Sequence, residues 1–105
     1  MTTDEMIEQA GAALAAAMPP QSRVILFGSR ARGEADESSD LDFLVIEPGI
    51  QRTAAESVRL RRVLREIPAA IDIIVVSEDL AARRGRVPGT MVDRALREGR
   101  VIAQS

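Results

Sequence analysis

Three short apolar runs, each bounded by turn-forming residues, constrain the fold of this 105-residue chain more than any other feature. They lie at residues 23–28 (RVILFG), 40–46 (DLDFLVI) and 70–76 (AIDIIVV). Runs of this length that are rich in β-branched residues are typical of buried strands. We therefore expect three strands of a small β-sheet.

Segments with helical spacing separate the strands. Thr2 and Glu5 have the spacing of a capping box, and the apolar residues that follow predict a helix over about residues 3–18. A second amphipathic helix is predicted over residues 51–67, because apolar residues recur there at helical spacing among arginines. Pro68 ends the pattern.

The last third of the chain also has helix signals. Ser77 is a predicted N-cap of a short helix, and Thr90 is a predicted N-cap of a last helix that runs to Gly99. An edge strand is expected over residues 100–103. The order of elements predicts an α+β fold, a small mixed β-sheet with helices packed on one face. The length leaves room for one domain, residues 1–105.

Composition excludes several kinds of chemistry. The chain has no Cys, no His and no Lys, so thiolate metal sites, imidazole catalysis and a phosphate-binding lysine are all excluded. With a net charge of −2 and only two aromatic residues, we expect no direct nucleic-acid binding. No run reaches the roughly 20 apolar residues of a membrane span, and the acidic start is unlike a signal peptide. The expected location is the cytoplasm.

Gly28 and Ser29 follow the first strand, where one helical turn is predicted over residues 29–33 and a polar loop over residues 34–39. A strand that leads into a helical turn presents free backbone N–H groups, and glycine lets a phosphate approach the chain closely. A Gly-Ser pair is also a common turn dipeptide. The pair alone therefore leaves both interpretations open.

Asp40 and Asp42 begin the second predicted strand, where alternation places both carboxylates on one face. Two like charges this close favour a cation between them, and hard oxygen ligands suit Mg²⁺ or Mn²⁺. The alternative is a solvated strand end. Asp72 interrupts the third strand, where a buried unpaired charge would be costly. If the two strands are neighbours, Asp72 joins the other two acids around a metal pair; the alternative is a buried ion pair with an arginine.

Together these features resemble a known family. Gly28-Ser29, ten intervening residues, Asp40-Leu41-Asp42 and a later strand aspartate resemble the minimal nucleotidyltransferases (MNT) of the DNA polymerase beta superfamily. Among these proteins, the chain is similar to the MNT antitoxins that are paired with HEPN toxins. The resemblance covers about residues 23–76, and the ending at residues 93–102 (DRALREGRVI) is also similar.

The resemblance implies a role for each matching residue. Gly28 and Ser29 would hold the β- and γ-phosphates of a nucleotide. Asp40 and Asp42 would hold two Mg²⁺ ions, and Asp72 would bind the metal near the attacking hydroxyl and take its proton. To these we add Arg30 and Arg32 as candidate triphosphate contacts, because arginine offers a bidentate fork to phosphate. Either arginine could equally be a solvated charge.

The implied function is a Mg²⁺-dependent transfer of AMP from ATP, or of another nucleotide, to a hydroxyl group. The acceptor would be a tyrosine of a partner HEPN toxin, and the chain would act as an antitoxin. A second hypothesis is a non-catalytic module that masks its partner. A third is transfer to a small molecule. A glycosyltransferase is disfavoured because such enzymes need a longer chain.

Overall fold

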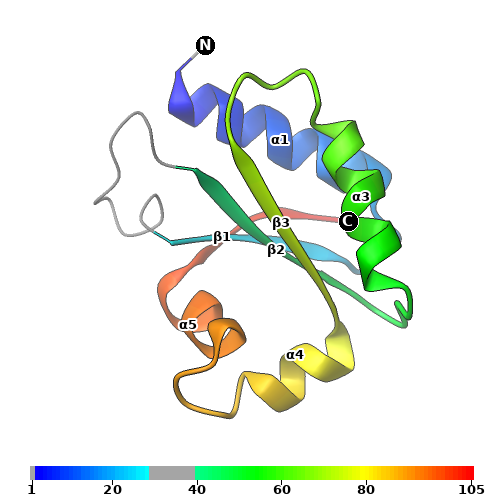
Figure 1. Cartoon of the computed structure of the whole chain (residues 1–105), viewed down its shortest axis with the longest axis vertical. Helices are drawn as coiled ribbons and strands as arrows, with labels where there is room; N and C mark the ends of the chain where they lie inside the picture. The colour runs from blue at the N-terminus through cyan, green and yellow to red at the C-terminus, as the bar shows by residue number, and fades with distance from the viewer. Residues whose placement is uncertain (1, 29–39) are drawn as a thin grey trace.

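The structure, a computed structural model, describes residues 2–28 and 40–105 (Figure 1). The expected helical turn at residues 29–33 and the expected loop at residues 34–39 lie outside the described residues. The described helices and strands are, in chain order, α1 (Thr3–Ala17), β1 (Arg23–Phe27), β2 (Leu41–Glu47), α3 (Thr53–Val63), β3 (Ile71–Ser77), α4 (Glu78–Arg84), α5 (Met91–Glu98) and β4 (Arg100–Gln104).

The strands form one mixed sheet in the order β3-β2-β1-β4. β1 pairs antiparallel with both β2 and β4, whereas β2 and β3 pair in parallel. The three predicted strands and the edge strand at the end of the chain are therefore confirmed. The parallel pair has a specific consequence: the N-terminal ends of β2 and β3, where the two strand aspartates lie, meet at the same edge of the sheet.

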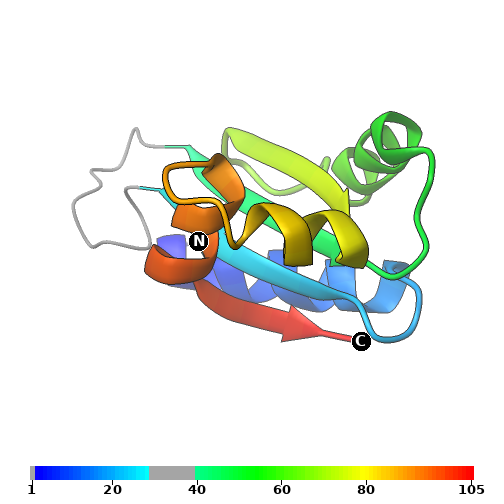
Figure 2. The ribbon, with the colours of Figure 1, turned by 90° about the horizontal axis from the view of Figure 1, so that it is seen from below.

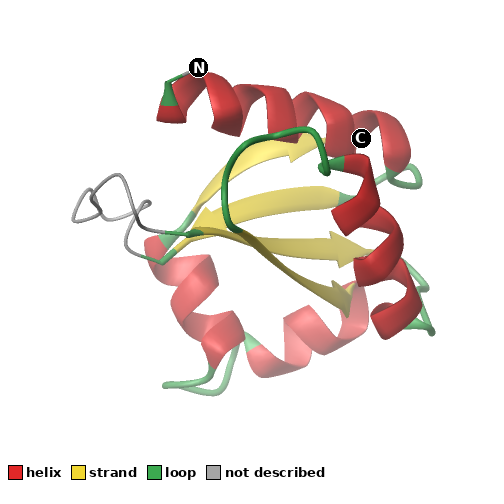
Figure 3. Ribbon diagram, turned by 45° about the horizontal axis from the view of Figure 1, so that its top comes forward, coloured by secondary structure: helices red, strands yellow, loops and turns green. Residues whose placement is uncertain are grey.

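Both faces of the sheet are covered by helices. On one face, Phe43 of β2 packs in a cluster with Leu14 of α1 and Leu60 of α3. On the other face, Ile46 of β2 packs with residues of α4 and α5. The strands of Figure 3 accordingly lie between the two pairs of helices, and Figure 2 shows α4 and α5 in front of them.

The α+β class and the mixed sheet are confirmed, but the expectation of helices on one face is wrong. The physical reason is present in the strands themselves. Leu44 and Ile46 are as fully buried as their neighbours Phe43 and Val45, so β2 is apolar on both faces. A strand that is apolar on both sides needs cover on both sides.

Side-chain caps set the starts of three helices, as predicted. Thr2 and Glu5 form a complete capping box at α1. The hydroxyl of Ser77 accepts a hydrogen bond from the backbone of Leu80 at the start of α4, and that of Thr90 accepts one from the backbone of Asp93 in α5. These bonds satisfy N–H groups that otherwise have no partner within the helix.

The helix α3 ends earlier than the pattern predicts. Beyond Val63 the backbone continues in tighter turns, in which Leu64 bonds back to Arg61 and Ile67 to Leu64, three residues apart. Leu64 and Ile67 stay buried in the core despite the change. Pro68 disfavours helical backbone at Ile67 and has no N–H to donate to Leu64, so the helix cannot run on to residue 67. No helix among the described residues is long and apolar enough to cross a membrane.

Candidate active site

Asp42 and Asp72 occupy matching positions on neighbouring strands. Each is the second residue of its strand, and the two are register partners in the parallel pair β2–β3. Paired residues of adjacent strands point to the same face, and such strands lie about 4.8 Å apart. Since Phe43 and Ile73 face α1 and α3, the two carboxylates share the face on which α4 and α5 pack.

The aspartates act on one another electrostatically. Burial raises the pKa of Asp42, and the carboxylates of Asp72 and Asp40 raise it further. Asp40 directly precedes β2 and is exposed. Each negative charge makes it harder to ionise the next one, and a cation among them would reverse this effect. All three sequence-predicted acids therefore lie within electrostatic reach at one edge of the sheet.

Asp72 is not buried, contrary to the argument drawn from its apolar strand. Its side chain is 64 % exposed, because β3 is an edge strand. An Arg61 guanidinium nitrogen lies 3.9 Å from the carboxylate, in an ion pair that is open to solvent. The alternative of a pair with an arginine is thus realised, but at the surface. An exposed pair of this kind contributes little to stability.

Three carboxylates do not yet form a complete metal site. Across residues 2–28 and 40–105, no group of three acidic side chains is close enough together to hold a metal ion. The structure brings Asp42 and Asp72 together through strand register and places Asp40 beside them. These residues provide hard oxygen donors at the N-terminal ends of β2 and β3.

Gly28 lies directly against this edge. It directly follows β1 with a φ of 80°, a conformation that residues with a side chain rarely adopt. A Cβ atom at this position would collide with the carboxylate of Asp42. A side chain at this position would therefore strain the backbone and push the Asp42 carboxylate aside. The other predicted phosphate contacts, Ser29, Arg30 and Arg32, lie outside the described residues.

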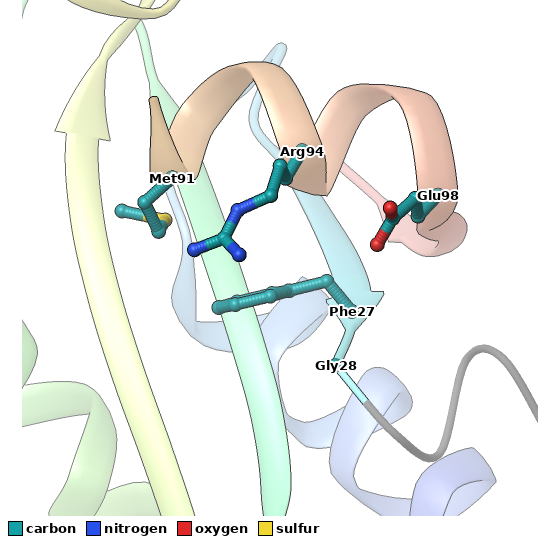
Figure 4. A pocket seen from close by; sticks show the side chains of 5 residues that line it. All are labelled: Phe27, Gly28, Met91, Arg94 and Glu98. Atoms are coloured by element: carbon teal, nitrogen blue, oxygen red, sulfur yellow. The ribbon is translucent and has the colours of Figure 1, made fainter. Parts of the chain in front are cut away.

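A pocket opens beside Gly28, between the end of β1 and α5 (Figure 4). Phe27 at the end of β1 and the following Gly28 line one side, and Met91, Arg94 and Glu98 line it from α5. Sequence reasoning missed the three helical residues. Their spacing of three and four does place them on one face of α5, but nothing in the sequence shows that this face lies opposite β1.

Comparison with protein families identifies the family of the chain. The sequence profile described as "Nucleotidyltransferase domain" matches residues 13–98. The chain belongs to this nucleotidyltransferase family. The matched span of the nucleotidyltransferase includes Gly28, Asp40, Asp42 and Asp72 as well as all of α5. No curated protein matches the chain.

Solved structures show the same fold. A protein assigned as a minimal nucleotidyltransferase is 34% identical, with 93% of this chain and 91% of that chain covered and a TM-score of 0.50. A protein from Sulfolobus solfataricus that is assigned as a nucleotidyltransferase is 26% identical, with 92% and 76% covered and a TM-score of 0.60. A toxin–antitoxin structure with AMP-PNP is 16% identical, with 99% and 75% covered and a TM-score of 0.64. At that identity, the last match shows the fold alone.

Proposed function

We propose that this nucleotidyltransferase uses a divalent metal to transfer AMP from ATP to a hydroxyl group on a partner protein. The observation that carries the proposal is the register pairing of Asp42 with Asp72, beside a glycine that the Asp42 carboxylate contacts closely. Family membership supplies the reaction class. The geometry provides neighbouring acids, a glycine at which a phosphate can approach the backbone, and the exposed edge of β3, where an acceptor can enter.

The donor set suits a divalent ion in its chemistry. Carboxylate oxygens are preferred ligands of Mg²⁺ and Mn²⁺. Burial first, and then the like charges of Asp72 and Asp40, raise the pKa of Asp42, and a bound cation would offset the effect of the like charges. In this proposal Asp40, Asp42 and Asp72 hold two such ions. When bound, the ions stabilise negative charge on the attacking and leaving oxygens.

The chain's own residues position the reactants. The turn at Gly28 lets the nucleotide phosphates approach the backbone. The acceptor oxygen forms a bond to the α-phosphorus while its proton passes to the carboxylate of Asp72. The bond from the α-phosphorus to the oxygen that bridges to the β-phosphate breaks, and pyrophosphate leaves with that electron pair. Exposure of Asp72 fits its position on the acceptor side.

We further propose that the acceptor is a tyrosine of a HEPN-type toxin and that the chain acts as its antitoxin. The support is the toxin–antitoxin structure with AMP-PNP, which has the fold of this chain. A tyrosine hydroxyl at the exposed edge of β3 would meet Asp72 without any rearrangement of the core.

The test is a transfer assay with ATP, Mg²⁺ and the product of the adjacent gene as the candidate acceptor. Label on the α-phosphate should appear on the partner, whereas label on the γ-phosphate should not, since it leaves in pyrophosphate. Asp42→Asn should lower the rate by about a thousandfold, because the lost charge stabilisation is worth several kcal/mol. Asp79→Asn, an exposed acid on α4, is the matched control and should retain activity.

Stability distinguishes a catalytic acid from a structural one. Because Asp42→Asn removes a crowded charge, the variant should unfold at the same or a higher temperature than the wild type. Absence of transfer by the wild type, or full transfer by Asp42→Asn, contradicts the proposal. Neutralisation of the partner by a variant that lacks all three aspartates would instead favour the masking module.

A further inference from the structure

The pocket between β1 and α5 lies next to the proposed nucleotide site without containing any of its acids. It has a volume of about 130 Å³ and is lined by Phe27 of β1, by the following Gly28 and by three residues of α5. Sites for whole drug-sized ligands have volumes of roughly 300–1,000 Å³. This pocket therefore suits one part of a ligand whose remainder lies elsewhere.

Close packing fixes α5 over the end of β1. Ala95 is fully buried in a cluster with Ile25 of β1. Gly99 follows the helix, and a Cβ atom there would lie 2.6 Å from the Ile25 side chain and 2.7 Å from the Leu26 carbonyl oxygen. The helix can approach this closely only because position 99 has no side chain. The pocket is therefore held by packed elements on both sides.

Arg94 places a positive charge in this pocket. Its guanidinium makes no hydrogen bond or ion pair with any described residue, whereas that of Arg97, in the same helix, is bound to the carboxylate of Asp93. Figure 4 shows the Arg94 guanidinium over the ring of Phe27, in the pocket that Gly28 also lines. An aromatic face beneath a guanidinium orients it and leaves its N–H donors at the rim available.

The order of residues across the sheet indicates on which side of the nucleotide the leaving group lies. Asp72 lies on β3, Asp42 on the neighbouring β2 and Gly28 at the end of the next strand, β1, with Arg94 above β1. In a phosphoryl displacement the attacking and leaving oxygens lie roughly in line on opposite sides of the phosphorus. If the attacking hydroxyl is at Asp72, as the proposed function has it, the leaving group lies toward β1 and Arg94.

We propose that Arg94 binds the terminal phosphates of the nucleoside triphosphate and holds the departing pyrophosphate in this pocket. The inference rests on the proposed function and extends it to the leaving group. A guanidinium binds phosphate oxygens through two parallel hydrogen bonds, and its charge matches the charge that develops there. Glu98 also lines the pocket, but it has an interaction of its own and is not an unpaired carboxylate that faces the ligand.

The experiment compares binding of ATP, AMP and inorganic tripolyphosphate, each with Mg²⁺, by calorimetry. Arg94→Gln should weaken binding of ATP and tripolyphosphate by about ten- to a hundredfold, as expected for loss of a charged hydrogen-bonding pair. AMP binding should change less than about twofold, because AMP lacks the terminal phosphates. Arg62→Gln is the matched control, an exposed arginine on α3 that should leave all three affinities unchanged.

The outcomes separate this inference from the function on which it rests. If wild type and Arg94→Gln bind ATP and tripolyphosphate equally, or if the variant loses AMP and ATP binding alike, the role of Arg94 is refuted while the proposed function stands. A wild-type protein that binds neither ATP nor AMP refutes both. Arg94→Lys, which keeps the charge but not the fork, should restore ATP affinity only in part.

Discussion

Gly28 shows how one residue can serve the backbone and the site together. Its φ of 80° costs an L-residue about 1–2 kcal/mol, and a side chain would also displace the carboxylate of Asp42. We expect Gly28→Ala to lose both stability and transfer activity. Gly49→Ala is the control, because Gly49 has a φ of 71° but no atom within 4 Å of its would-be Cβ. It should lose a similar amount of stability in thermal unfolding and keep its activity.

If both alanine variants keep the wild-type rate of transfer, Gly28 has no role at the site beyond its backbone conformation. Loss of activity in Gly28→Ala alone is the result that the contact with Asp42 predicts.

Glu47 is a second residue whose environment determines its charge. It is fully buried at the end of β2, and burial together with the neighbouring Glu56 raises its pKa to about 7. Glu56 itself is held ionised by Arg59, whose guanidinium lies 2.7 Å and 2.8 Å from its two oxygens, so the pKa of Glu56 is lowered. Glu47 is therefore the member of this cluster that retains a proton.

The raised pKa predicts a pH-dependent loss of stability. A carboxyl that binds its proton more tightly in the folded state stabilises the protein below its ordinary pKa, and the contribution is lost as pH rises toward about 7. Glu47→Gln imitates the protonated form. In chemical unfolding it should match the wild type near pH 4.5 and exceed it above pH 7 by up to about 3 kcal/mol. An equal difference at both pH values would contradict the assignment.

At the scale of elements, α5 depends on its cap. The helix has eight residues, which is too short to be stable through backbone bonds alone. The Thr90 hydroxyl accepts from the Asp93 backbone, and the Asp93 carboxylate accepts from the Gly89 backbone and from Arg97. The backbone of Gly89 and then Arg97 hold the pKa of Asp93 below its usual value.

Removal of this cap should be felt in the whole domain. Thr90→Ala is expected to lower the free energy of unfolding by about 1 kcal/mol, as for other threonine caps. Thr53→Ala is the control: Thr53 begins α3, where no side chain caps the helix, and it should cost less. Equal losses in urea unfolding would show that the hydroxyl of Thr90 is not a stabilising cap.

Local signals predicted the elements well, and their limits are physical. The caps at Thr2, Ser77 and Thr90 act within four residues, so the sequence alone locates them. The end of α3 depends on competition between helical bonds and the turns that precede Pro68, which apolar spacing does not reveal. The C-terminal end of a helix is therefore harder to predict from sequence than its start.

At the scale of the molecule, the sequence predicts only the part of the site that follows from two strands being neighbours. Once β2 and β3 are neighbours, alternation alone brings Asp42 beside Asp72. The exposure of Asp72 follows instead from the position of β3 at the sheet edge, and the approach of Arg94 to Gly28 follows from α5 packing on β1. Both depend on contacts between distant parts of the chain, which no local pattern encodes.

The pairing of β4 with β1 has a consequence for how the protein is made. Residues 100–104 complete the outer edge of a strand formed by residues 23–27, and the carbonyl of Ile102 packs closely against Gly11 of the first helix. At a synthesis rate of about 5–20 residues per second, the first strand waits on the order of 4–15 s for this partner. Until residues 100–104 are made, the outer edge of β1 has backbone N–H and C=O groups without their sheet partners.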